Sequence, residues 1–149
     1  MRIALHTHSA VSDGTDTPAE LVAAAARAGL DVVALTDHDT FDGIAEAQAA
    51  GVRLGLRVIP GIELSTRHAG RSVHLLGYGV DPDHPALAAE LERIREGRTG
   101  RLEPVLAKLA ELGVPVTAEQ VAARAGDSPS LGRPHIADAL IAAGHVVDR

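Results

Sequence analysis

The sequence predicts an α/β fold that begins with alternating strands and helices. Two observations support this prediction: apolar runs with strand character recur at residues 2–7, 30–36 and 57–63, and a helical pattern separates each run from the next. This order of elements is typical of a parallel sheet or barrel. The 149 residues, 46% hydrophobic and 23% charged, suit one globular domain that can bury a core.

The first predicted helix has clear boundaries. Thr17 is a cap residue, Pro18 suits the first helical position, and Glu20 stands three residues after the cap. Gly29 follows the alanine-rich stretch and predicts the end of the helix. A second helix is expected over roughly residues 41–54, before the third strand.

The pattern changes after Glu63, which is expected to end the third strand. Residues 64–68 and 71–77 are predicted to form two strands joined by a tight turn, since the connection is too short for a crossover helix. From Pro85 onward the chain is expected to be helical. The four predicted helices cover residues 86–97, 102–112, 117–125 and 134–143.

Composition excludes several classes of protein. Because the chain has no cysteine, any metal must bind to His, Asp or Glu. Two aromatic residues and a net charge of -6 disfavour base stacking and a large basic surface, so long duplex nucleic acid is not an expected partner. No apolar stretch is long enough for a signal or membrane segment, so we expect a cytoplasmic protein without a membrane partner.

Potential metal ligands stand at the ends of successive predicted strands. His6 and His8 are two residues apart, so they share one face of a strand. His38 follows the second strand and Glu63 ends the third. The carboxyl ends of parallel strands form one functional edge, so these side chains are expected to converge. Taken alone, the two neighbouring histidines are equally well explained as a polar strand edge.

Two further candidates have ordinary explanations when each is considered alone. Asp13 lies beside a glycine in a loop, where a solvated turn aspartate is the alternative. His74 alternates with apolar neighbours, where a buried, hydrogen-bonded histidine is the alternative. Only the complete set favours a metal site.

This ordered set resembles the N-terminal motifs of the PHP (polymerase and histidinol phosphatase) family. The similar segments span most of residues 1–80 and are His6-Thr7-His8, Asp13, Thr36-Asp37-His38, Gly61-Ile62-Glu63 and His74-Leu75-Leu76-Gly77-Tyr78. Residues 133–137 resemble a motif of the stand-alone phosphoesterase branch, which includes nucleotide bisphosphate phosphatases and short-RNA exonucleases.

The resemblance implies a distorted seven-stranded (β/α) barrel of PHP type. Residues 1–84 would form its N-terminal part and residues 85–149 a helical insert or cap. It also implies two or three divalent metal ions, either manganese, zinc or iron. The implied ligand sets are His6, His8 and Glu63 for one metal, Glu63 and His74 for a second, and Asp13 and His38 for a third.

The implied reaction is hydrolysis of phosphate esters of small nucleotides or short RNA ends by a metal-bound hydroxide. Arg133 is predicted to bind phosphate oxygens, and His135 to bind metal or protonate a leaving group. The alternative is that both are ordinary residues of a first helical turn. Asp37 and Asp39 are expected to orient histidine ligands.

Full family members carry further C-terminal ligand motifs that this chain lacks. We therefore expect a truncated barrel that is close to inactive alone, with an exposed apolar face. Two alternatives to a nucleotide phosphoesterase remain: a histidinol-phosphate phosphatase, and a non-catalytic metal-binding module like those attached to replicative polymerases.

Overall fold

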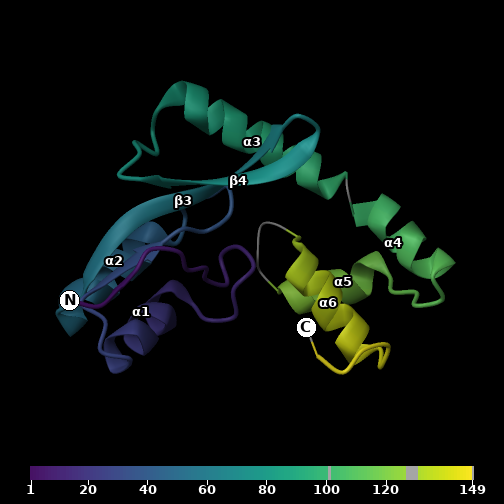
Figure 1. The fold of residues 1–149 in the computed structure, drawn as a ribbon, viewed down its shortest axis with the longest axis horizontal. Coiled ribbons are helices and arrows are strands. Elements are labelled where there is room, and N and C mark those ends of the chain that lie inside the picture. The colour runs from purple at the N-terminus through teal and green to yellow at the C-terminus, as the bar shows by residue number, and fades with distance from the viewer. Residues whose placement is uncertain (101, 127–130, 149) are drawn as a thin grey trace.

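The computed structural model describes residues 1–100, 102–126 and 131–148, which contain four strands and six helices. The predicted α/β class is confirmed (Figure 1). In chain order the elements are β1 (Ile3–Ala4), α1 (Pro18–Arg27), β2 (Val32–Leu35), α2 (Ile44–Leu54), β3 (Arg57–His68), β4 (Arg71–Tyr78), α3 (Pro85–Thr99), α4 (Leu102–Glu111), α5 (Ala118–Ala125) and α6 (Arg133–Ala142).

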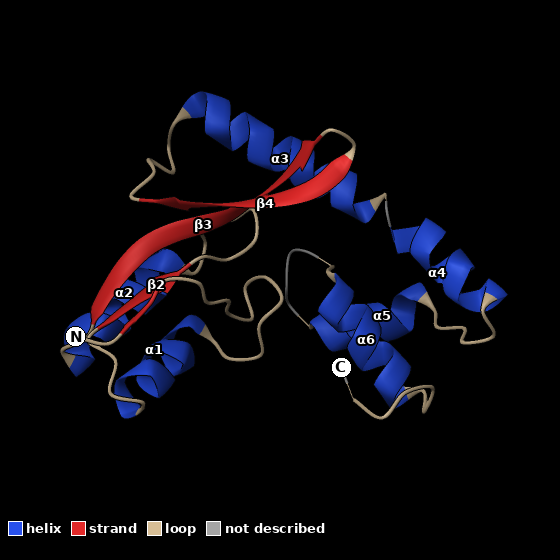
Figure 2. Cartoon of the chain, viewed as in Figure 1, coloured by secondary structure: helices blue, strands red, loops and turns tan. Residues whose placement is uncertain are grey.

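The four strands form one sheet in the order β1-β2-β3-β4. The β1–β2 and β2–β3 pairs are parallel, whereas β3 and β4 form the predicted antiparallel hairpin. Figure 2 shows that β3 curves along its length. Helices α1 and α2 pack on the sheet through a core that includes Val22, Ala47 and Leu35, all fully buried.

Two strands differ from their predicted lengths. β3 does not end at Glu63, because its parallel pairing with β2 stops at Pro60 and its antiparallel pairing with β4 begins at Gly61. The backbone stays extended across this change of partner. β1 is only two residues long, so His6 and His8 lie beyond it. There the chain is held instead by the Thr7 hydroxyl, which donates to the Ala34 carbonyl at 2.6 Å.

The predicted capping box of α1 is present. Thr17 Oγ1 accepts the Glu20 backbone N–H at 3.2 Å, and Glu20 Oε2 accepts the Thr17 backbone N–H at 2.9 Å. The Thr17 backbone and then its hydroxyl lower the pKa of the Glu20 carboxyl. A charged carboxylate thus faces the positive end of the helix.

We expect Thr17→Ala to lower the free energy of unfolding by about 1 kcal/mol, because helix N–H groups lose their acceptor. Urea denaturation followed by circular dichroism measures this change. Thr15→Ala is the control, since Thr15 is exposed and lies outside the helix. Equal losses in both variants would show that the cap is not the cause.

The helices after β4 have their own core. Val121 on α5 is fully buried and clusters with Leu106, Val116 and Ala139. Figure 1 shows α4, α5 and α6 gathered in one group, with α3 leading to them from the hairpin. This second core supports the predicted division into a barrel part and a helical part after residue 84, which stays a prediction. Residues 101, 127–130 and 149 lie outside the described part of the chain. No helix within the described ranges is long and apolar enough to cross a membrane.

Candidate metal centre

The structure brings the six predicted metal ligands together. They form three groups whose nitrogen and oxygen atoms lie within 4.8 Å of one another: His6, His8 and Glu63; His8, Asp13 and His38; and His38, Glu63 and His74. The first group is the set that the resemblance implies. The other two contain the implied pairs and add His8 or His38. Because His8, His38 and Glu63 each belong to two groups, the three groups form one connected cluster.

In the first group, one carboxylate oxygen meets two imidazoles. Glu63 Oε2 lies 2.6 Å from His6 Nε2 and 2.9 Å from His8 Nε2, and the two nitrogens are 2.9 Å apart. All three atoms can offer lone pairs. Glu63 is only 5% exposed, so little water reaches its carboxylate to screen these contacts. Such converging donors suit a divalent cation.

Asp13 reaches the cluster because the loop before α1 folds back. Its Oδ1 lies 3.4 Å from His8 Nδ1 and its Oδ2 lies 3.5 Å from His38 Nε2. Gly14 makes this return possible, since a Cβ there would stand 2.3 Å from the His8 carbonyl oxygen. Asp13 therefore faces two imidazoles, and both separations exceed an ordinary charge-assisted hydrogen bond.

The second oxygen of Glu63 faces the remaining histidine. Its Oε1 lies 2.6 Å from His74 Nδ1, while Oε2 is 3.9 Å from His38 Nε2. Burial alone would raise the pKa of Glu63, but the hydrogen bonds from His6 and His74 and the charge of His38 outweigh it. The pKa of this carboxyl is therefore lowered, and the carboxylate is ionised at neutral pH.

The donor chemistry of the cluster fits divalent cations. Four imidazoles and two carboxylates supply borderline and hard ligands, without a thiolate that would select softer metals. The Nδ1 atom of His8 is buried and makes no hydrogen bond within the described residues. Buried ring nitrogens of this kind normally have a partner, and a cation beside Asp13 would supply one.

Asp37 binds a loop and does not orient a histidine, so that prediction is wrong. The residue is 2% exposed, and its carboxylate accepts three hydrogen bonds: from Ser9 N–H at 2.7 Å, from Ser9 Oγ at 2.6 Å and from Ser12 Oγ at 2.7 Å. These bonds fasten the loop between the second histidine and α1. Asp39 accepts the Ser65 backbone N–H at 2.7 Å. The sequence analysis did not single out Ser9 or Ser12.

The two predicted catalytic residues both lie in the first turn of helix α6 but differ in exposure. Arg133 is exposed and lines the pocket beside the cluster. His135 is 5% exposed, and its Nδ1 accepts the Gly132 backbone N–H at 3.0 Å. In the described part of the chain it belongs to none of the metal-ligand groups. A neutral ring that accepts at Nδ1 carries its proton on Nε2, so His135 can donate a hydrogen bond from Nε2 but does not offer Nδ1 to a metal.

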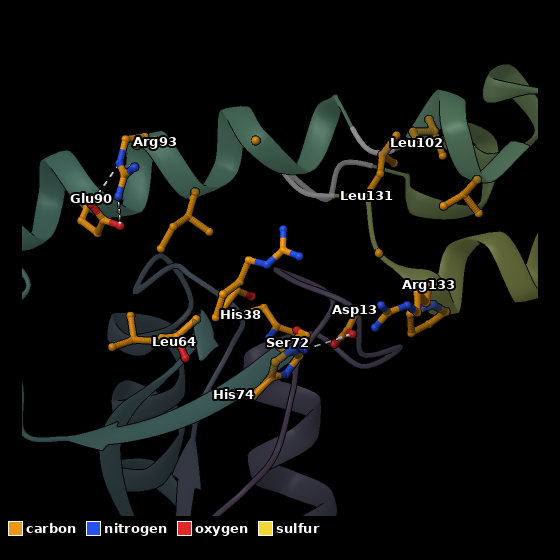
Figure 3. A pocket seen from close by; sticks show the side chains of 18 of the residues that line it. Asp13, His38, Leu64, Ser72, His74, Glu90, Arg93, Leu102, Leu131 and Arg133 are labelled. Carbon is orange, nitrogen blue, oxygen red and sulfur yellow. Dashed lines mark hydrogen bonds and ion pairs between the residues drawn. The ribbon is translucent and has the colours of Figure 1, made fainter. Parts of the chain in front are cut away.

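A cavity of about 1030 Å³ opens beside the cluster. Figure 3 shows Asp13, His38 and His74 together at its floor, with Arg133 next to Asp13. The β3–β4 hairpin, α3, α4 and the start of α6 form the walls. The pocket is thus large enough for a small organic ligand held against the cluster.

Comparison with known proteins decides the family. Residues 4–93 match the PHP domain family, which is more than half of the chain. The chain belongs to the PHP domain family. A solved PHP-type relative, an amidohydrolase from Chromobacterium violaceum with bound sulfate and no metal, is 41% identical with a TM-score of 0.91. The alignment covers 99% of this chain and 52% of the relative, which confirms the expected fold class, an incomplete PHP barrel, here with four strands and six helices in the described residues.

Curated relatives of the PHP chain include two hydrolases. The 3',5'-nucleoside bisphosphate phosphatase of Chromobacterium violaceum is 42% identical over 147 residues, covering 98% of this chain and 51% of the relative. A 5'-3' exoribonuclease of Haemophilus influenzae is 38% identical over 142 residues, covering 95% of this chain and 51% of that relative. The chain therefore spans about half the length of the curated relatives it matches.

Proposed function

We propose that this PHP chain contributes the metal-binding half of a phosphoesterase that hydrolyses phosphate esters of small nucleotides or short RNA ends. The observation that supports it most is the connected cluster in which His8, His38 and Glu63 are shared between groups of metal ligands. The cluster lies at the floor of a pocket that also holds Arg133. Paired metal sites with a nearby arginine suit phosphate ester hydrolysis.

The number and type of metal belong to the same proposal. Three overlapping groups would hold two or three divalent ions, and imidazole with carboxylate suits manganese, zinc or iron. Bound there, such ions would lower the pKa of a coordinated water molecule and neutralise the charge of phosphate oxygens.

The proposed roles of the chain's own residues follow from their positions. Glu63 spans the cluster with its two oxygens and so fixes the spacing of the ligands on either side. The Arg133 guanidinium presents a planar fork of donors that matches phosphate oxygens. His135 would protonate the leaving oxygen only as an imidazolium, for which its Nδ1 must release the Gly132 N–H and take up a proton.

The relatives agree on phosphate chemistry and differ in substrate. One is named for nucleoside bisphosphates and the other for RNA, and the solved relative binds sulfate, a tetrahedral anion like phosphate. A small phosphorylated substrate is the common element that we propose for this chain.

We also propose that residues 1–149 turn over poorly without further barrel strands. Ile3, Leu5 and Tyr78 on or beside the strands are 46%, 44% and 41% exposed. Apolar side chains that are exposed along a sheet normally pack against another element. Comparable turnover by residues 1–149 and by a longer protein that contains them would contradict this part of the proposal.

Phosphate release tests the function. Phosphate is measured from a 3',5'-bisphosphonucleoside and from histidinol phosphate, and mononucleotide release from a 5'-phosphorylated dinucleotide, each with manganese and after chelation. We expect release from a nucleotide that chelation abolishes. Release from histidinol phosphate alone would instead indicate a histidinol-phosphate phosphatase. Bound metal without release from any substrate would indicate a non-catalytic metal-binding module.

A further inference from the structure

Tyr78 is the last residue of the 74–78 segment that resembles the PHP family, and the proposed chemistry gives it no role. Its hydroxyl donates to the Leu5 carbonyl at 2.7 Å, across 73 positions of the chain. Tyr78 ends β4 and Leu5 directly follows β1, and these are the two outer strands of the sheet. The Tyr78 side chain therefore links opposite ends of the sheet.

This hydrogen bond ends at the backbone beside the metal ligand His6. On one side of His6, Leu5 is held through its carbonyl by Tyr78. On the other side, the Thr7 carbonyl accepts the Thr36 backbone N–H at 2.9 Å, and Thr36 directly follows β2. The short segment that carries His6 is thus fastened to two different parts of the sheet, and Tyr78 provides the attachment before the histidine.

His6 has less support from its surroundings than the other ligands of its group. Its side chain is 50% exposed, compared with 21% for His8 and 6% for Glu63. It belongs to one of the three ligand groups, whereas His8 and Glu63 each belong to two. An exposed side chain is held in place mainly by the backbone from which it projects, and metal ligands must be placed within about 0.5 Å to bind well. Movement of residues 5–7 would therefore weaken the ion that His6 binds and spare the others.

The hydroxyl can be removed without disturbing the strand that carries it. The Tyr78 backbone stays in register with Gly61 on β3, and the Gly79 N–H donates to the Pro60 carbonyl at 3.0 Å. The ring has few rotatable bonds, so holding it in place costs little conformational entropy. His74 lies earlier on β4 and is held by the pairing of the hairpin. Loss of the hydroxyl alone should therefore leave His74 in place.

We propose that Tyr78 is a positioning residue of the metal centre: its hydroxyl holds the segment that carries His6, so the ion bound by His6, His8 and Glu63 depends on it. This rests on the proposed function, because it requires the cluster to bind metal. The ions held by the other two groups do not share this dependence, since neither group contains His6.

Removal of the single hydroxyl tests the proposal. In calorimetric titration of residues 1–149 with manganese, Tyr78→Phe should weaken one ion per chain by about tenfold and leave the remaining affinity unchanged. Thr117→Ala is the matched control, because the Thr117 hydroxyl also bonds to the backbone, accepting the Gln120 N–H at 3.3 Å, but lies at the start of α5. It should leave every ion bound as before. Circular dichroism verifies that the variants fold.

A double-mutant cycle with His6 separates positioning from general damage. Once His6→Ala has removed the ligand, Tyr78→Phe should change the affinity of the remaining ions by less than about twofold. In metal-free protein, Tyr78→Phe should shift the NMR signals of the His6 ring and leave those of His74 unchanged. A purely structural role of the hydroxyl would weaken metal binding equally with or without His6.

Unaltered manganese binding by Tyr78→Phe, or an equal loss of affinity in the presence and absence of His6, would overturn the positioning role. Phosphate release from a nucleotide is measured in parallel on residues 1–149 and on a longer protein that contains them. Metal binding that depends on Tyr78 through His6, without release by either protein, rejects the phosphoesterase alone. Metal-dependent release without this dependence rejects the positioning role alone. No manganese binding by the unaltered protein would reject both.

Discussion

Glu63→Gln is expected to remove metal from the cluster and to lower phosphate release by at least about 100-fold. The carboxylate belongs to two of the three ligand groups. One oxygen faces His6 and His8 and the other faces His74, at 2.6–2.9 Å. A neutral amide of the same shape replaces one of these oxygens with an NH₂ group, which cannot bind a cation.

Metal content by mass spectrometry, manganese titration and phosphate release together measure this effect. Glu111→Gln is the matched control, because Glu111 is exposed on α4 and, among the described residues, is paired only with Lys108. It should leave metal binding and release unchanged. Circular dichroism verifies that both variants fold. A Glu63→Gln protein that keeps its full metal content would show that Glu63 is not a shared ligand.

The predictable parts of this fold are those that local sequence determines. The capping box of α1 lies within four residues, so Thr17 and Glu20 are sufficient to predict it. The metal ligands were predictable as a set for a related reason. Crossover connections place the carboxyl ends of parallel strands at one edge, so His8 and His38 had to approach each other once the strands were assigned.

The unpredicted parts depend on contacts between distant residues. β3 continues past Glu63 because β4 replaces β2 as its partner, which no pattern within the strand reveals. Asp37 meets Ser9 across 28 residues. The sequence alone therefore could not distinguish an aspartate that fastens a loop from an aspartate that orients a histidine.

Asp37→Asn is expected to remove one metal ion per chain and leave the remainder bound. Asp37 contacts no imidazole through its described bonds, but it fastens the loop that carries Asp13 through Ser9 and Ser12. An asparagine keeps one oxygen and turns an NH₂ group toward a hydroxyl donor, so at least one buried bond is lost or must rearrange. Asp13 would then move away from His38, and metal affinity there should fall by about 10- to 100-fold.

Two further variants separate loop position from general damage at Asp37. Asp37→Ala leaves three buried donors without an acceptor and should lower the free energy of unfolding by about 3 kcal/mol, whereas Asp37→Asn should lower it by about 1 kcal/mol. Asp42→Asn makes the same change at an exposed position nearby and should alter neither stability nor metal content. Metal counts and urea denaturation measure both quantities. If Asp37→Asn loses stability but binds every metal with unaltered affinity, the loop does not depend on Asp37 to place Asp13. If all metals are lost together, the cluster binds its ions as one cooperative unit.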